Sequence, residues 1–329
     1  MSYKVVLTDH VFPEESLVSQ VRIQAGVNLE VHHVHDEERL MEITRDADAV
    51  LVEMAHITRR VVENMTRCRL ISRHGVGYDT LDVDAATDAG IMACNVTDYS
   101  TSEVADHAMA MLLALARSLF AADREVRSGG WDVFAACGKN QRIDGQTLGI
   151  VGFGKIGQAV ARRAAGFGLN LVGYDPYLPE SAMKPLGARK AELDELLRTS
   201  DLVSLHVPLS AATHHLIDEN RLRLMKPTAF LVNTSRGGLV DLAALTVALQ
   251  KGRLAGAGLD VFEKEPPAKD DPLLSMPNVI VSPHAGFYSQ GSLIDLHTRQ
   301  AKQVAAVLAG QRPDNLLNPA VLEHLRPLP

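Results

Sequence analysis

The sequence has few cysteines, and they lie far apart. Cys68, Cys94 and Cys137 form no CxxC pair, so neither a disulfide framework nor a cysteine zinc site is suggested. Such a small number of widely separated cysteines is typical of proteins in a reducing compartment. The first residues also enter a strand pattern at once, without the apolar core of a signal peptide. We therefore expect a cytoplasmic protein.

The sequence also lacks an excess of positive charge and any long apolar run. Its 33 Lys and Arg against 40 Asp and Glu give a net charge of −7, which makes nucleic acid a poor partner. The longest apolar stretch, residues 108–116, is shorter than the roughly 18 residues of a membrane span. We expect no metal either, because His32, His33 and His35 have no clear acidic or cysteine partner set.

Short β-rich runs alternate with helical patterns along the chain, which is typical of parallel sheets covered by helices. A length of 329 residues suits about two domains. We therefore expect two doubly wound α/β domains. A discontinuous substrate domain of residues 1–99 and 286–329 would hold an inserted dinucleotide-binding domain of residues 100–285. Long helices are expected at about 102–120 and 293–308.

The most informative motif is a glycine pattern between two strand-like runs. The apolar run 148–151 meets Gly152, Gly154 and Gly157 in the spacing GxGxxG, and Asp175 ends a second run 18 positions after the last glycine (175 − 157). Such glycines allow a tight turn, a close approach to pyrophosphate and helix packing on the strand. The acid accepts hydrogen bonds from ribose hydroxyls and repels a 2′-phosphate. The pattern predicts an NAD site, with a turn that needs glycine only for packing as the alternative.

Three later strand ends carry unusual polar residues, namely Arg236, Glu265 and His284. In an open α/β sheet, ligands collect beyond the carboxyl ends of the strands, so these segments should converge. Hydride transfer at a carbinol carbon needs a proton carrier, a cation for the substrate and a group that holds the carrier. Taken alone, Arg236 fits a surface ion pair, Glu265 a turn and His284 a buried core position. Together, downstream of the glycine pattern, they favour catalysis.

These segments resemble the signature motifs of the D-isomer-specific 2-hydroxyacid dehydrogenases over nearly the whole chain, including residues 75–79, 95–103 and 206–209. The resemblance implies a Rossmann NAD-binding domain inserted into a flavodoxin-like substrate domain. It also implies that Arg236 grips the substrate carboxylate and carbonyl oxygen. His284 would be the general acid in reduction and the base in oxidation, and Glu265 would stabilise the charged imidazole.

Further site residues follow from the same resemblance. The loop 73–78 would present backbone N–H groups to the substrate carboxylate. The implied substrate-binding residues are Arg73, Val76, Gly77 and Arg236. The implied cofactor-binding residues are Val76, Gly152, Gly154, Lys155, Ile156, Gly157, Asp175, Val207, Thr234, Ser235 and Asp260. A homodimer built on the long helices is also implied, although residues 108–115 fit an interdomain core equally well.

Differences from the motifs of other members of this family narrow the choice of substrate. Formate dehydrogenases pair the histidine with glutamine, whereas this chain has Glu265, and phosphite-oxidising members carry lysine at about the position of Val76. Phosphoglycerate dehydrogenases carry an arginine near residues 52–54, which here are Val, Glu and Met. A glyoxylate or hydroxypyruvate type of substrate is favoured. The alternatives are a phosphoglycerate dehydrogenase and, because residues 282–290 resemble that branch, an NAD-responsive scaffold like the C-terminal-binding-protein corepressors.

Overall fold

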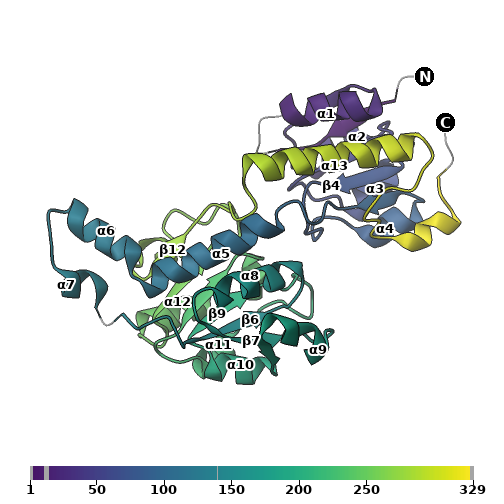
Figure 1. The fold of residues 1–329 in the computed structure, drawn as a ribbon. Coiled ribbons are helices and arrows are strands. Elements are labelled where there is room, and N and C mark those ends of the chain that lie inside the picture. Colours follow the sequence, from purple (N-terminus) through teal and green to yellow (C-terminus); the bar gives the residue numbers. More distant parts are fainter. Residues whose placement is uncertain (1–2, 11–14, 139, 327–329) are drawn as a thin grey trace. The chain divides into compact units, whose positions relative to one another are not determined.

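The computed structural model describes residues 3–10, 15–138 and 140–326. Contacts within the chain divide it into two units. Unit 1 combines Met1–Ser100 with Ser289–Pro329, and unit 2 spans Thr101–Tyr288. In Figure 1 the two parts of unit 1 appear in purple to blue and in yellow, and unit 2 runs from blue to green. The two ends of the chain thus build one unit.

The sheet of unit 1 is parallel, in the order β2-β1-β3-β4-β5. Its strands are β1 (Val5–Leu7), β2 (Leu29–Val31), β3 (Ala49–Val52), β4 (Leu70–Arg73) and β5 (Met92–Cys94). This is the flavodoxin-like strand order. The central strands are buried on both faces, as parallel strands covered by helices require, so their sequences are almost continuously apolar.

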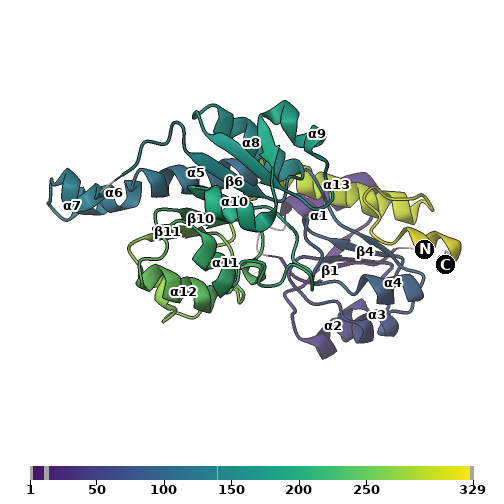
Figure 2. The same cartoon turned by 90° about the horizontal axis from the view of Figure 1, so that it is seen from below.

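Helices from the two ends of the chain share one face of this sheet. The helices of unit 1 are α1 (Glu15–Ala25), α2 (Glu37–Thr44), α3 (Arg59–Asn64), α4 (Val83–Asp88) and α13 (Gln290–Leu308). Helices α1 and α13 lie side by side and cover the face that buries Val5 (Figures 1 and 2). The other three cover the face that buries Val6. Neighbouring strand residues thus point to opposite layers.

The sheet of unit 2 is also parallel, in the order β12-β11-β10-β9-β6-β7-β8. Its strands are β6 (Thr147–Val151), β7 (Asn170–Tyr174), β8 (Ala188–Lys190), β9 (Leu202–Leu205), β10 (Phe230–Asn233), β11 (Gly256–Leu259) and β12 (Val279–Val281). β6 pairs with both β7 and β9, so the strand order reverses there. Ligands of doubly wound sheets bind beyond the carboxyl ends at this switch point. The predicted fold class is confirmed.

Helices cover both faces of this second sheet. The helices of unit 2 are α5 (Thr101–Ala116), α6 (Leu119–Arg127), α7 (Val133–Cys137), α8 (Lys155–Ala165), α9 (Glu180–Met183), α10 (Leu193–Thr199), α11 (Glu219–Leu224) and α12 (Leu242–Gln250). Of these, α6 and α7 bury no side chain and project from the sheet instead of covering it. Ala108, Leu112 and Leu115 of α5 pack with Leu148 and Phe153 in the core of unit 2. These side chains of α5 therefore belong to the core of unit 2.

Two predicted helix ends were wrong. The helix expected over 102–120 ends at Ala116, because Ser118 has φ 50°, a left-handed conformation that a continuing helix does not allow, and α6 starts after it. The C-terminal helix begins at Gln290 instead of 293, where Ser289 and Ser292 form a reciprocal cap. Among the described residues, no single helix is long and apolar enough to cross a membrane. Only α5 and α6 taken together pass that test, across a 62° bend.

Candidate active site

The glycine turn after β6 has the geometry that a dinucleotide needs. Gly152 has φ +91°, and a Cβ there would come within 2.6 Å of the His206 backbone. A Cβ at Gly157 would overlap the carbonyl oxygen of Gly152, so this glycine lets α8 pack closely on the turn. Gly154 has no heavy atom within 4 Å of its Cβ position and is exposed. The backbone is therefore open to a ligand at the middle glycine.

The N-terminus of α8 adds hydrogen-bond donors at the same place. Gly154 is its N-cap residue and supplies no side-chain cap, while Lys155 is exposed and Ile156 is half-buried in the first turn. Backbone N–H groups of a first helical turn lack partners inside the helix and bind anions well. These residues fit the pyrophosphate of a dinucleotide.

Asp175 directly follows β7 and lies against the glycine turn. Its Oδ2 accepts a hydrogen bond from the Phe153 N–H at 3.1 Å, and its Oδ1 accepts from the N–H groups of Tyr177 at 2.9 Å and Leu178 at 3.2 Å. Backbone donors thus fix the carboxylate beside the turn. A carboxylate has about four acceptor sites, so this one retains capacity for ribose hydroxyls.

The strands on the other side of β6 carry further predicted contacts. Val207 is buried and contacts the position of a Cβ on Gly152. Ser235 donates from Oγ to the Leu205 carbonyl at 2.9 Å, so its hydroxyl supports the loop. The Thr234 Oγ1 is buried and has no hydrogen-bond partner among the described residues. An orphaned buried hydroxyl is costly, which fits a ligand group at Thr234.

Asp260, expected near the nicotinamide, shapes the loop that carries His284. Its carboxylate accepts hydrogen bonds from the Ser282 hydroxyl and from the N–H groups of Ala285 and Gly286 at 2.8 Å each. Burial raises the pKa of the Asp260 carboxyl. The hydrogen bonds from His107, Ser282 and the two amides outweigh burial and hold the pKa below its ordinary value. The carboxylate is therefore an ionised anchor of this loop.

Two side chains that complete this anchor, His107 and Ser282, were not among the predicted site residues. His107 of α5 lies with Nε2 2.8 Å from the Ser282 hydroxyl, which in turn bonds Asp260. No spacing rule relates these residues, because α5, β11 and the segment after β12 are far apart in sequence. A serine directly before the Pro283-His284 pair was the one available signal.

His284 and Glu265 form a close pair. The imidazole Nδ1 lies 2.8 Å from Oε2 of the glutamate, while Oε1 accepts a hydrogen bond from the Phe262 N–H at 3.0 Å. A carboxylate can only accept, so Nδ1 is the donor and Nε2 remains as the ring atom that can meet a substrate. Burial alone would raise the pKa of Glu265. The hydrogen bond and charge of His284 lower it, as do the Phe262 N–H and the charge of Arg236. Together they outweigh burial, so the pKa lies below its ordinary value.

Arg236 lies next to the loop that carries Glu265. It follows β10, its Nη1 donates to the Ser235 carbonyl at 2.9 Å, and its charge helps to lower the pKa of Glu265. The next residue, Gly237, packs so closely that a Cβ there would overlap the Phe262 backbone. The structure thus brings all three predicted catalytic residues together within unit 2.

The predicted substrate loop belongs to unit 1. Arg73 ends β4 and is buried, with Nη1 donating to the His74 carbonyl at 2.7 Å, so its guanidinium braces the loop from inside. Val76 is exposed and its carbonyl accepts from the Asn95 amide at 2.6 Å. Gly77 is half-buried beside it.

Comparison with known proteins gives concordant results. Residues 109–286 match the family described as D-isomer specific 2-hydroxyacid dehydrogenase, NAD binding domain. A glyoxylate reductase of Korarchaeum cryptofilum is 44% identical over 287 residues, which cover 86% of each chain. A D-3-phosphoglycerate dehydrogenase of Methanocaldococcus jannaschii is 39% identical over 92% of this chain, which spans only 56% of that relative's length.

A solved structure extends the likeness to both units. The D-lactate dehydrogenase of Aquifex aeolicus, in complex with NAD and lactic acid, aligns with a TM-score of 0.85 and 31% identity. The alignment covers 93% of this chain and 96% of that one. The comparison therefore includes the unit that lies outside residues 109–286.

Proposed function

This chain belongs to the D-isomer specific 2-hydroxyacid dehydrogenase family and is an NAD-dependent oxidoreductase of 2-oxo and D-2-hydroxy acids. From that premise we propose a small substrate without a phosphate, of the glyoxylate or hydroxypyruvate type. The observation that carries the proposed mechanism is the 2.8 Å contact between His284 and Glu265, beside Arg236.

The catalytic roles follow from the chemistry of these side chains. Bound NADH supplies the hydride for reduction. Arg236 would hold the substrate carboxylate and carbonyl oxygen, because a guanidinium offers planar paired donors and stays charged. His284 would give its Nε2 proton to the carbonyl oxygen as the alcohol forms and take it back in oxidation. Glu265 would stabilise the imidazolium through Nδ1.

We assign the cofactor site to the switch point of unit 2. The turn of Gly152 and Gly154 with the first residues of α8 would bind the pyrophosphate, and Asp175 the adenosine ribose. The remaining predicted contacts are Val76, Val207, Thr234, Ser235 and Asp260. Because the Asp175 carboxylate would repel a 2′-phosphate, NADH should bind more tightly than NADPH.

We propose that unit 1 binds the substrate. The charges at two of its strand ends support the choice of an acid without a phosphate. Beyond β1 and β3, the Asp9 carboxylate accepts hydrogen bonds from the N–H groups of Glu53, Met54 and Ala55 at 2.6–3.1 Å. Residues 52–57 contain no Lys or Arg. This segment offers a phosphate no Lys or Arg as a charged partner, so 3-phosphohydroxypyruvate should be a poor substrate.

We also propose a homodimer in the cytoplasm. Large apolar side chains are exposed along α6, α7 and their connection, among them Trp131 at 89% and Phe134 at 81% exposure. In Figures 1 and 2 these helices project from the sheet of unit 2. Such a patch suits a second copy of the chain. The three distant cysteines favour a reducing compartment.

The test is NADH consumption with glyoxylate, hydroxypyruvate, pyruvate and 3-phosphohydroxypyruvate, with NADPH as the cofactor control. We expect rapid turnover of glyoxylate or hydroxypyruvate and little of the phosphorylated acid. Preferred turnover of 3-phosphohydroxypyruvate would overturn the substrate assignment. Tight NADH binding without turnover of any acid would favour the NAD-responsive scaffold instead.

A further inference from the structure

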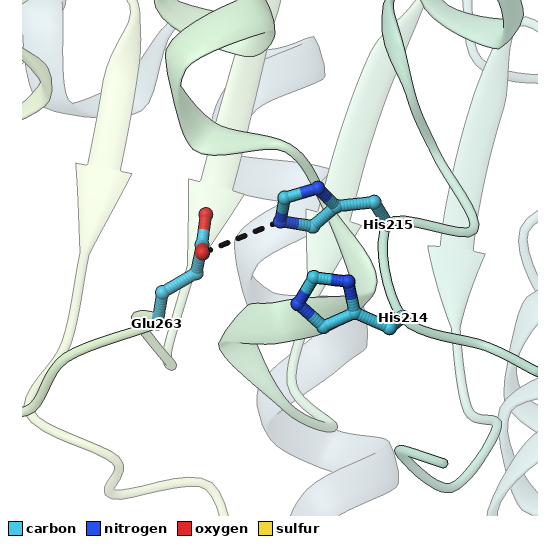
Figure 3. A group of neighbouring side chains, drawn as sticks. All are labelled: His214, His215 and Glu263. Carbon is cyan, nitrogen blue, oxygen red and sulfur yellow. Dashed lines mark hydrogen bonds and ion pairs between the residues drawn. The ribbon is translucent and has the colours of Figure 1, made fainter. Parts of the chain in front are cut away.

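A second group of ligating side chains lies outside the catalytic trio. Figure 3 shows His214 and His215, from the segment after β9, facing Glu263, from the segment after β11. The ligating atoms of the three side chains all lie within 4.8 Å of one another. His214 and Glu263 are exposed and His215 is half-buried, so an ion can reach the group from solvent.

The spacing of two of these ligands already fits a tetrahedral ion. His215 Nε2 and Glu263 Oε2 are 3.3 Å apart. Ligands bonded to zinc at about 2.0–2.1 Å lie about 3.3–3.4 Å from each other in a tetrahedral site. The two imidazole rings are stacked, with centroids 4.0 Å apart and 24° between their planes. A rotation of the exposed His214 side chain would complete three ligands.

Backbone contacts hold the ligands in this arrangement. The second oxygen of Glu263, Oε1, accepts a hydrogen bond from the Leu242 N–H at 3.3 Å at the start of α12. The His215 N–H donates to the Gly238 carbonyl at 2.7 Å, which ties the histidine pair to the segment after β10. His215 also has φ 48°, which breaks the alternation of an extended chain and lets consecutive rings lie on one side. Partners of this kind orient ligands in metal sites.

We propose that His214, His215 and Glu263 bind one divalent transition-metal ion of the zinc class, with the fourth position open to water. Two imidazoles and a carboxylate suit zinc better than magnesium or calcium, which prefer oxygen ligands alone. The sequence-based expectation of no metal considered only His32, His33 and His35. The adjacent histidines proposed here do not reveal by spacing a glutamate that lies 48 residues after His215. The ion would join the segment after β9 to the segment that also carries Glu265, and so act as a clamp.

The test uses the full chain without a histidine tag, stripped with a chelator and titrated with Zn²⁺ by calorimetry. We expect one ion per chain and a Tm that rises by a few degrees with Zn²⁺, because a ligand that binds only the folded state stabilises it. His214→Ala, His215→Ala and Glu263→Gln should each weaken binding by about tenfold or more. Mg²⁺ should produce neither effect.

Two matched controls separate this group from other histidines. His35→Gln removes an exposed histidine of unit 1 and should leave Zn²⁺ binding unchanged. His284→Gln tests whether the catalytic pair is the true ligand, and it should retain the ion. Loss of Zn²⁺ binding in His284→Gln, or unchanged binding in both His214→Ala and Glu263→Gln, would overturn the proposal. So would an unsubstituted chain that binds no Zn²⁺. Because Glu263→Gln keeps the side-chain shape, it serves even if His215→Ala does not fold.

Discussion

Two glutamates of one loop, Glu263 and Glu265, each face a histidine, and the two pairs differ in their surroundings. The His284–Glu265 pair is 2.8 Å apart, with side chains 29% and 25% exposed, and Arg236 adds its charge. The His215–Glu263 pair is 3.3 Å apart, with 34% and 40% exposed, and a second imidazole is stacked beside it. We therefore expect a histidine and a glutamate to transfer protons where Arg236 is the neighbour, and to bind a metal ion where His214 is the neighbour.

In the proposed mechanism, the Arg236 guanidinium beside the first pair would draw an anionic substrate to His284, the proton carrier. The His214 imidazole beside the second pair would add a third ligand for the proposed metal ion. Substitution of the matching residue in each pair should therefore have different effects on turnover and on metal binding.

The largest expected effect is on turnover. His284→Ala should lower kcat for 2-oxo acid reduction by about 10²–10⁴-fold, because the proton donor is lost. His215→Ala, the matching change in the other pair, should leave kcat close to that of the unsubstituted protein. Steady-state kinetics with saturating NADH would measure both. Equal losses in the two variants would contradict the division of roles.

His206 has no carboxylate partner among the described hydrogen bonds and ion pairs, and its effect should fall on stability instead of turnover. His206 is half-buried, its Nε2 lies 2.9 Å from the Ser204 hydroxyl, and burial of the imidazole lowers its pKa to about 4. The unfolded chain takes up this proton near pH 6.5, whereas the folded chain does not. The free energy of unfolding should therefore hold above pH 6.5 and fall as the pH drops toward 4. His206 should account for about 2–3 kcal/mol of the loss by pH 4.5.

Urea unfolding at pH 7 and pH 4.5 would measure this loss, with His206→Gln as the control. The difference between the two pH values should be smaller in the variant, because the glutamine does not titrate. An identical pH dependence in both proteins would show that His206 does not carry the effect.

A smaller effect is expected at Asp175, whose carboxylate is held by backbone amides instead of a histidine. Asp175→Ala should weaken NADH binding by about tenfold, because hydrogen bonds to a charged group are lost. NADPH binding should weaken less or improve, because the repulsion of the 2′-phosphate disappears. Fluorescence titration with both cofactors tests this. Unchanged affinity for both would rule out the ribose contact.

The fold was largely predictable, and local breaks in it were not. The apolar runs that alternate with helical patterns predicted both parallel sheets, because strands buried on two faces need apolar residues throughout. The spacing of Gly152, Gly154 and Gly157 predicted the turn after β6. The end of α5 depends on the left-handed conformation of Ser118, which no periodicity encodes. Catalytic candidates were predictable because parallel strands end at one edge. The group of His214, His215 and Glu263 could not be predicted, since it depends on the positive φ of His215.

The roles of His284 and Glu265 are best tested by comparing Glu265→Gln with Glu263→Gln, the same change two positions apart. Glu265→Gln should lower kcat for glyoxylate or hydroxypyruvate reduction by about 10- to 100-fold, because the charge that stabilises the imidazolium is removed. Glu263→Gln should keep near-normal kcat. Equal kcat values for the two variants, whether both normal or both reduced, would contradict the assignment of His284 and Glu265 as the proton-transfer pair.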